Sequence, residues 1–440
     1  MEEKGIYKSL TGLFKSKKVW FVFCIIFQVV IFVFFCKNRV FWQYGGDTWT
    51  YQITSLQDFS WYHRTVGYQL VMYICYLLGG QVYDEPSYIY VVWFQVVVAA
   101  IANLALCDSL WDTLKSKKFA VMFGIMGSIL LVIYGWSEIL MPESLAVSIM
   151  CIHIWVLTKA LTTKKRIYFI FLAPIGLMGI LLRPSYVFIL AVLGVFFVIY
   201  FFFTDKKRAV YGMLSLLICT IIVLGYCGHN KKLIGVFCLS NVTYYNELTD
   251  LISGDMYQNL DYPEMTDLVQ QVIDENDGNN WSKAGIVCSM ADNREVVEYI
   301  KSCRKLYAKE YLQLIYQYAD EYKSQSILES YSVFGEDLSF GLRYLTMLTM
   351  PFNYISMLIL TGIFFLFSVV ESFFRKKPSY MEIGISGCIL AIYFLSVIAC
   401  HTAHLQRIAI CILPCMIFME AMILDKVIMF IKRKTICGKK

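Results

Sequence analysis

The chain has 440 residues, of which 58% are hydrophobic and 16% are charged, and its formal net charge is +6. Apolar runs of about 20 residues recur along it, and each is long enough to cross the hydrocarbon core of a bilayer as a helix. The runs do not alternate between apolar and polar residues, which excludes a transmembrane β-barrel. The composition therefore predicts an all-α polytopic membrane protein.

The first apolar segment, 19–36, follows Lys15, Lys17 and Lys18. Because the cytoplasmic flanks of membrane helices collect Lys and Arg, this helix is expected to lead the chain out of the cytoplasm. It is too long for the apolar part of a signal peptide and has no small-residue cleavage site. We therefore expect it to be a membrane span.

Ten spans are predicted in all, because basic clusters then fall on alternate loops. The spans are 19–36, 87–108, 119–135, 142–160, 167–182, 186–203, 209–227, 345–371, 380–400 and 408–430. The clusters are Lys15/Lys17/Lys18, Lys115/Lys117/Lys118, Lys164/Lys165/Arg166, Lys206/Lys207/Arg208, Arg375/Lys376/Lys377 and Lys432/Arg433/Lys434. This pattern predicts a multi-pass protein of the cell membrane with both termini in the cytoplasm.

The first outer segment, 37–86, contains an apolar stretch that is too short to span, Val66 to Leu78. We expect this stretch to be an amphipathic helix on the outer membrane surface. A shorter helix, Thr48 to Gln57, is expected before it.

The second outer segment, 228–344, has 18 acidic and 10 basic residues, a net charge of −8 that leaves +14 on the rest of the chain. This asymmetry predicts an extracytoplasmic domain between a membrane core at 1–227 and membrane helices at 345–440. Residues 292–330 are predicted to form one or two helices. Residues 250–290 are rich in Gly, Asn and Asp and are predicted to be loop.

The 15 cysteines follow no motif, and most lie in apolar segments, where cysteine acts as a small hydrophobe. Cys238, Cys288 and Cys303 fall in the outer segment, where one disulfide among them is an open alternative. The sequence has no P-loop and no HExxH motif, so neither a nucleotide cofactor nor a metal is indicated. The basic clusters are explained by topology, so no nucleic-acid partner is expected.

Asp47 closes the tripeptide Gly45-Gly46-Asp47, just beyond the first span. A carboxylate near the membrane surface can remove a proton from an acceptor hydroxyl or amine. Asp is also a favoured helix N-cap, and Asp47 precedes Thr48 and Trp49. The two roles are compatible.

Glu138 and Glu143 lie between the third and fourth spans, and Glu143 follows Pro142 at the start of an apolar helix. The helix dipole stabilises an acid there. Ionisable groups at membrane depth usually line a cavity, which makes both acids candidates for a site. On one continuous helix they would point about 140° apart and could not share a site.

Several basic residues are expected near the outer membrane surface. Arg183 ends the fifth span, where it can act as an interface anchor or bind a lipid phosphate. His63 and Arg64 precede the surface helix and have the same two alternatives.

A third basic group, His401, His404 and Arg407, stands at the outer end of the last span. Steps of three residues place these side chains within an arc of about 120° on one helix. Such a group suits a phosphate. A zinc site would need a further ligand, such as His63 or a carboxylate.

Taken in order, these motifs resemble the GT-C superfamily of membrane glycosyltransferases, in the branch of protein O-mannosyltransferases and aminoarabinose transferases. The resemblance rests on GGDTWTYQ (45–52), HRTVGYQLVMYICYLLGG (63–80), MPESLAV (141–147) and HLQRIAICILP (404–414). It covers the membrane core and the last span but not 228–344. The chain departs from the family pattern at Thr48, where many relatives have a second acid.

The resemblance implies an inverting enzyme that moves a sugar from a polyprenyl-phosphate donor to a glycan, lipid or protein acceptor, without a cofactor. Asp47 would be the general base, and Glu143 would orient the sugar or support Asp47. Arg407, with Arg183 and His404, would hold the donor phosphate. The remaining candidate substrate-binding residues are His401, His63, Arg64, Tyr51 and Glu138.

Two other functions stay open. A polysaccharide polymerase or ligase would rely on arginines of the large outer segment, such as Arg304 and Arg343. A transporter of lipid-linked sugars would carry charged residues deep within its spans, and the predicted spans are nearly free of them.

Overall fold

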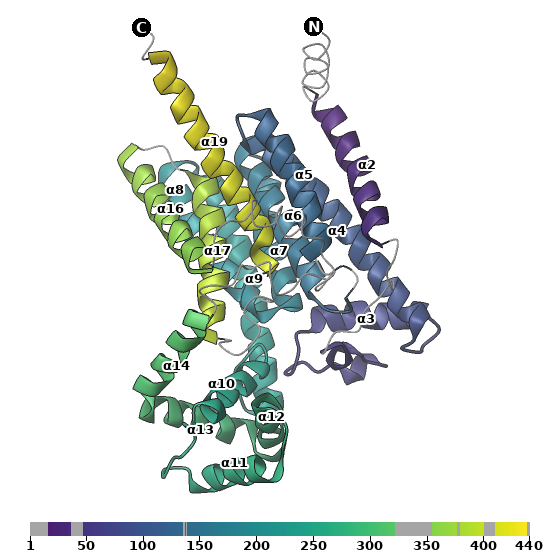
Figure 1. Cartoon of the computed structure of the whole chain (residues 1–440), viewed down its shortest axis with the longest axis vertical. Helices are drawn as coiled ribbons and strands as arrows, with labels where there is room; N and C mark the ends of the chain where they lie inside the picture. The colour runs from purple at the N-terminus through teal and green to yellow at the C-terminus, as the bar shows by residue number, and fades with distance from the viewer. Residues whose placement is uncertain are drawn as a thin grey trace.

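The computed structural model describes residues 16–36, 47–134, 137, 139–321, 354–375, 379–399 and 410–437. Regular secondary structure in these ranges is helical, and they contain no β-strand. Figure 1 shows long helices running together in the upper part of the molecule and a group of shorter helices below them. The predicted all-α class is confirmed for the described residues.

Ten of the described helices match the ten predicted spans in position. They are α2 (Lys17–Cys36), α4 (Glu85–Thr113), α5 (Lys117–Tyr134), α6 (Glu143–Thr163), α7 (Arg166–Leu182), α8 (Val187–Phe203), α9 (Lys206–Ile234), α16 (Tyr354–Arg375), α17 (Tyr380–Ala399) and α19 (Leu413–Cys437). Within the described residues, four helical segments are long and apolar enough to cross a membrane, at 85–113, 143–163, 184–203 and 206–234. The total of ten spans stays a prediction.

The chain starts α2 and finishes α19 at the same end of the bundle, the upper end in Figure 1. Ion pairs tie the helices together there. Asp108 and Asp112 of α4 each lie 2.5–2.6 Å from the ammonium groups of Lys17 on α2 and Lys159 on α6. Asp425 of α19 accepts hydrogen bonds from the backbone N–H groups of residues 115 and 116. We call this end of the bundle the basic end.

Helix α3 (Val66–Leu78) has the bounds predicted for the surface helix. It lies across the opposite end of the bundle (Figure 1). Its inner face buries Tyr68, Gln69 and Met72, while Leu70 and Ile74 are exposed. An exposed apolar face suits contact with lipid.

Gly67 allows α3 to pack against α7. A Cβ atom at this position would lie 2.5 Å from the carbonyl oxygen of Leu181. Only glycine permits so close a backbone approach. The start of α3 is thereby fixed beside the end of α7.

The predicted helix from Thr48 to Gln57 is wrong as a single element. The structure has two short 3-10 helices, η1 (Thr48–Tyr51) and η2 (Leu56–Asp58), with extended backbone between them. The Tyr83 hydroxyl bonds both the N–H and the C=O of Ile53, at 2.9 and 2.7 Å. These groups therefore cannot join a continuous helix.

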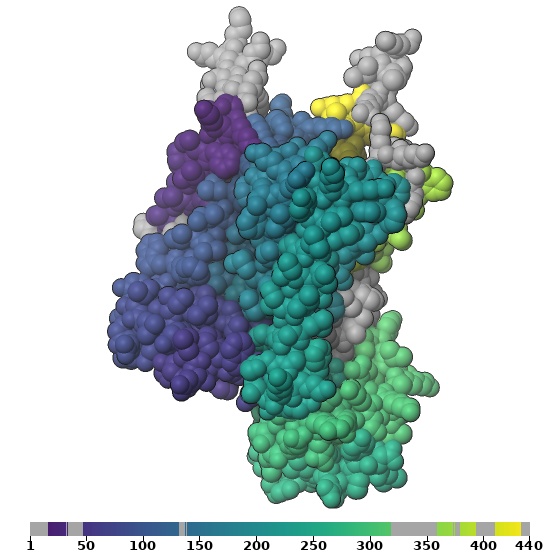
Figure 2. Space-filling model, turned by 180° about the vertical axis from the view of Figure 1, so that it is seen from behind, coloured from purple at the N-terminus to yellow at the C-terminus, as the bar shows by residue number. Residues whose placement is uncertain are grey.

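Helix α9 continues beyond its predicted end and carries the outer domain. Its 29 residues make it about 43 Å long, more than a bilayer core requires. In the rear view of Figure 2 the chain runs from the bundle down into the lower domain through this region. Gly235, in the left-handed conformation with φ of 74°, ends the helix.

The outer domain is built from α10 (Val242–Ser253), α11 (Pro263–Glu275), α12 (Asn280–Met290), α13 (Asn293–Leu306) and α14 (Ala308–Glu321). The helices enclose their own core, in which Leu248, Val269, Val287 and Tyr299 are fully buried. The prediction of loop for 250–290 is wrong, because α11 and α12 lie there. Pro263 at the start of α11 and the Asn279 cap of α12 are helix-start signals within a composition typical of loops.

The open alternative of a disulfide in the outer segment is not realised. Cys238, Cys288 and Cys303 are all free thiols, and the last two are buried. They pack as small apolar side chains.

Replacing Gly67 with alanine tests the contact between α3 and α7. We expect Gly67→Ala to lower the free energy of unfolding by about 2 kcal/mol, because the new methyl group meets backbone that cannot move aside. The measurement is thermal or denaturant unfolding in detergent. Gly225→Ala on α9 is the matched control, since no atom lies within 4 Å of its Cβ position. Equal stability of the two variants would contradict the argument.

The ion pairs at the basic end make a second stability prediction. Asp108 is 5% exposed and contacts two lysines, so Asp108→Asn leaves their charges poorly compensated. We expect a loss of about 2 kcal/mol in unfolding free energy, measured in the same way. Glu298→Gln breaks only an exposed pair with Arg294 and should change stability by less than about 0.5 kcal/mol. An Asp108→Asn variant with the same free energy of unfolding as the wild type would show that these ion pairs do not stabilise the packing of the helices.

Candidate functional site

Asp47 and Arg64 form the first part of the site. Oδ1 of Asp47 lies 3.3 Å from Nη2 of Arg64, and their side chains are 23% and 14% exposed. Nε of Arg64 donates to the hydroxyl of Thr50 at 3.2 Å, and that hydroxyl donates to the backbone carbonyl of Asp47 at 2.7 Å. Arg64 therefore binds both the side chain and, through Thr50, the backbone of the Asp47 turn.

Asp47 occupies the N-cap position of a helix, which was one of the two roles expected from the sequence. Asp47 precedes η1, but its side chain makes no capping hydrogen bond. The turn is held instead by Thr48, which is fully buried and donates to the carbonyl of Leu140 at 2.9 Å. The Asp47 turn is thus fixed on the segment that leads into α6, and its carboxylate is directed to Arg64.

Glu143 and Arg183 form the second part. Glu143 is the first residue of α6 and is fully buried, and its Oε1 lies 3.2 Å from Nη1 of Arg183 at the end of α7. The same Nη1 donates to Sγ of Cys411 at 3.5 Å. The pair therefore joins the outer ends of α6 and α7 to the segment that opens α19. A buried carboxylate and guanidinium stabilise each other where either alone would be costly.

Two tyrosines adjoin the first pair. The Arg64 guanidinium stands 5.4 Å from the ring centre of Tyr51, and Tyr51 packs edge-on against Tyr68 at 5.1 Å. Burial raises the pKa of the Tyr68 phenol well above its ordinary value, and the nearby charge of Glu143 adds to this. Contacts thus run from Asp47 through Arg64 and Tyr51 to Tyr68.

Gln95 connects Tyr68 to the segment that leads into α6. This amide is fully buried on α4 and accepts a hydrogen bond from the Tyr68 hydroxyl at 2.9 Å. Its Nε2 donates to the carbonyls of Ser137 and Ile139, both at 2.9 Å. Gln95 was not predicted from the sequence, although a polar amide within an apolar helix is a pattern that can mark a site.

His63 lies beside Arg64 but faces the outer domain. Its backbone carbonyl accepts from the hydroxyl of Ser240 at 2.7 Å, and its ring packs 5.6 Å from that of Tyr245. Burial, and to a lesser extent the charge of Arg64, lower the pKa of His63 to about 4 against the opposing effects of Asn241 and Asp47. The imidazole is therefore neutral at pH 7, so a phosphate contact would use a hydrogen bond rather than a charge.

The structure brings the predicted site residues Asp47, Tyr51 and Arg64 together in one group, and Glu143 and Arg183 in a second. His63 is a near neighbour. Glu138, His401, His404 and Arg407 lie outside the described residues. Among the side chains that the structure does describe, no group of three His, Cys, Asp or Glu gathers as a metal site would require.

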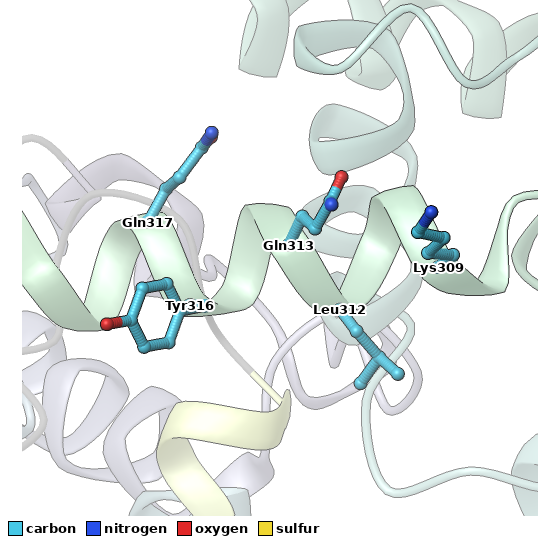
Figure 3. Close-up of a pocket in the computed structure, with 5 residues that line it drawn as sticks. All are labelled: Lys309, Leu312, Gln313, Tyr316 and Gln317. Atoms are coloured by element: carbon cyan, nitrogen blue, oxygen red, sulfur yellow. The ribbon is translucent and has the colours of Figure 1, made fainter.

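A shallow open pocket lies elsewhere, on α14 of the outer domain. It is lined by Lys309, Leu312, Gln313, Tyr316 and Gln317. Figure 3 shows Leu312 and Tyr316 on one side of the helix and the three polar side chains on the other. Neither arginine–carboxylate pair contributes to it.

No protein-family model matches the chain, and no curated protein matches it. Among solved structures, it is similar to the archaeal oligosaccharyltransferase AglB from Archaeoglobus fulgidus, solved in complex with an inhibitory peptide and a dolichol-phosphate. The identity is 14% and the TM-score 0.45, over 95% of this chain and 52% of that one. This chain therefore spans about half the length of that structure. A likeness of this degree is too slight to establish a shared function.

Proposed function

We propose that this protein is a membrane glycosyltransferase that moves a sugar from a polyprenyl-phosphate donor to an acceptor at the outer-domain end of the bundle. One observation carries the proposal. Two arginine–carboxylate pairs, Asp47 with Arg64 and Glu143 with Arg183, lie at one end of a bundle of apolar helices, where the close contact of Gly67 with Leu181 brings the elements that carry the two arginines together. Transfer from a lipid phosphate needs a base for the acceptor and a cation for the leaving phosphate, both at one end of the membrane helices.

Asp47 is the proposed general base. It takes the proton from the acceptor hydroxyl or amine as that atom forms a bond to the anomeric carbon. The bond from this carbon to the phosphate oxygen breaks on the opposite face, so the configuration inverts. Arg64, 3.3 Å away, favours the ionised form of the carboxylate that must accept the proton.

Arg183 is the proposed partner of the leaving phosphate. The phosphate oxygen keeps the electron pair of the broken bond, and a guanidinium in a largely buried site stabilises the charge that develops there. Glu143 holds Arg183 in place before the donor arrives. Arg407 and His404 are proposed to add to this cation site, and His401 and Glu138 to line it.

The partners follow from this chemistry. The donor brings its own activated phosphate in the lipid, so no nucleotide site is needed. The acceptor is a glycan, lipid or protein that approaches from the side of the outer domain. The enzyme then acts on the extracytoplasmic face, with the basic end of the bundle in the cytoplasm.

The polymerase or ligase alternative rests on arginines of the outer segment. Arg304 lies 3.1 Å from Glu247 and 4.8 Å from the ring centre of Tyr311, so it is tied into the fold of the outer domain. Arg343 lies outside the described residues. The described part of the outer domain thus offers less support for this function than the two pairs offer for transfer.

One observation favours the transporter alternative. Glu420 on α19 is 8% exposed, and its Oε1 has no hydrogen-bond partner among the described residues. Buried ionisable groups within membrane helices often serve transport. If Glu420→Gln leaves sugar transfer unchanged, Glu420 has no part in transfer, and any role of this residue in transport is separate from it.

The first experiment compares wild type with Asp47→Asn for transfer of labelled sugar from a panel of polyprenyl-phosphate sugars in vesicles. We expect transfer to fall at least about 100-fold, because an amide cannot accept the proton. Asp58→Asn is the matched control, since Asp58 lies in the same loop, is exposed and bonds only Thr54 and Ser55 among the described contacts. Full activity of Asp47→Asn would remove Asp47 as the base.

The role of Arg183 is tested by Arg183→Lys, which keeps the charge and loses the planar donor group. We expect kcat to fall about tenfold or more with a smaller change in KM, because the contact strengthens as the phosphate leaves. Arg208→Lys, at the basic end and paired with Asp205, should leave both constants near the wild-type values. A change in KM alone would indicate donor binding without a part in the chemical step.

A further inference from the structure

The segment that ends in Arg64 is held from both sides. On the inner side, the fully buried Gln69 of α3 accepts from the backbone N–H of Ser60 and donates to the carbonyl of Arg64, both at 3.0 Å. On the outer side, the segment meets α9 and the first residues of the outer domain. The position of the Arg64 backbone therefore depends on how this segment is held.

Asn230 makes the central outer contact. It is fully buried near the end of α9, and its Nδ2 donates to the carbonyl of Trp61 at 3.2 Å. The same amide donates to the carbonyls of Cys238 and Leu239, at 2.8 and 3.4 Å, where the chain turns toward the outer domain. The Tyr226 hydroxyl, one turn earlier on α9, also donates to the carbonyl of Trp61, at 2.6 Å.

The next two residues are bound in the same way. The carbonyl of Tyr62 accepts from the backbone N–H of Asn241 at 2.7 Å, and that of His63 accepts from Ser240 at 2.7 Å. Three consecutive carbonyls before Arg64 are therefore bonded, that of Trp61 by α9 and those of Tyr62 and His63 by the chain that links α9 to α10. Asn230 reaches from α9 to both the Trp61 segment and the linker.

We propose that Asn230 is a positioning residue for Arg64, which clamps the segment before Arg64 to the base of the outer domain. These hydrogen bonds hold the Arg64 guanidinium beside Asp47 and tie the outer domain to the Asp47 site. The inference deepens the proposed transferase function and rests on it for its catalytic meaning. The placement of Arg64 by Asn230 can be measured without any donor.

The first test measures how fast phenylglyoxal modifies Arg64 in the detergent-purified full chain, by mass spectrometry of the digested protein. We expect Asn230→Ala to speed modification of Arg64 about tenfold, because three carbonyls lose a shared donor and the segment opens more often. Arg304, bound within the outer domain, is the internal reference and should react at the same rate in every variant. Unchanged reactivity of Arg64 would overturn the proposal.

Two further variants test whether a change in the reactivity of Arg64 is specific to this junction or reflects a general loosening of the fold. Asn276→Ala, which removes only a bond to the carbonyl of Val272 in the outer domain, should leave the reactivity of Arg64 unchanged. Tyr226→Phe keeps the ring against Trp61 and removes one hydroxyl, and it should raise the reactivity of Arg64 in the same direction by a smaller factor. An equal rise in Asn276→Ala would attribute the effect to general loosening and overturn the proposal.

The second test is a double-mutant cycle in the transfer assay. Asn230→Ala should lower kcat in the wild-type background and have no further effect in Arg64→Gln, because the two changes act through one group. Equal losses in both backgrounds would overturn the positioning role. If the wild type transfers sugar from no donor, the proposed function fails, and the reactivity of Arg64 still decides whether Asn230 places it.

Discussion

The close contact between Gly67 and the backbone of Leu181 is the constraint on which the site depends. Arg64 lies three residues before Gly67, and Arg183 lies two residues after Leu181. Packing α3 directly on α7 therefore brings the two arginines to the same end of the bundle, although they are far apart in the sequence. A larger residue at position 67 would push α3 away and separate the two halves of the site.

The electrostatics of the site follow from where the pairs are buried. Burying a charge is expensive, and a guanidinium beside a carboxylate offsets much of that cost when their geometry is good. Glu143 is fully buried beside Arg183. The Asp47 side chain is 23% exposed beside Arg64, so it is the more accessible of the two carboxylates. The two guanidinium groups are exposed to nearly the same extent, so the pairs differ in the burial of their acids.

The outer domain is part of this arrangement through α9. That helix is longer than a membrane span needs, and its last turns meet the loop that carries Arg64. The neutral ring of His63, packed on Tyr245, belongs to the same junction. A domain with its own core is therefore joined to the candidate site by hydrogen bonds to backbone carbonyls, which hold a loop in place without adding charge beside Asp47 and Arg64.

The sequence by itself determined the features that depend on local composition. Long apolar runs predicted the positions of ten helices, and the bounds of Val66–Leu78 were predicted from its apolar stretch and flanking glycines. Asp47, Glu143, Arg64 and Arg183 were recognised as candidates because charged residues at the ends of apolar segments are few. Short helices such as α11 and α12 were missed, because the Pro and Asn residues at their starts are also typical of loops.

Only the tertiary structure decided which charges meet. Asp47 and Arg64 are separated by two 3-10 turns and an extended stretch, and Glu143 and Arg183 by two helices, so no sequence period relates them. The buried amides Gln95, Gln69 and Asn230 bond carbonyls of distant loops, and such partners have no signature in the sequence. Hydrogen bonds and ion pairs of this kind depend on packing between helices, which hydrophobic pattern and charge count do not specify.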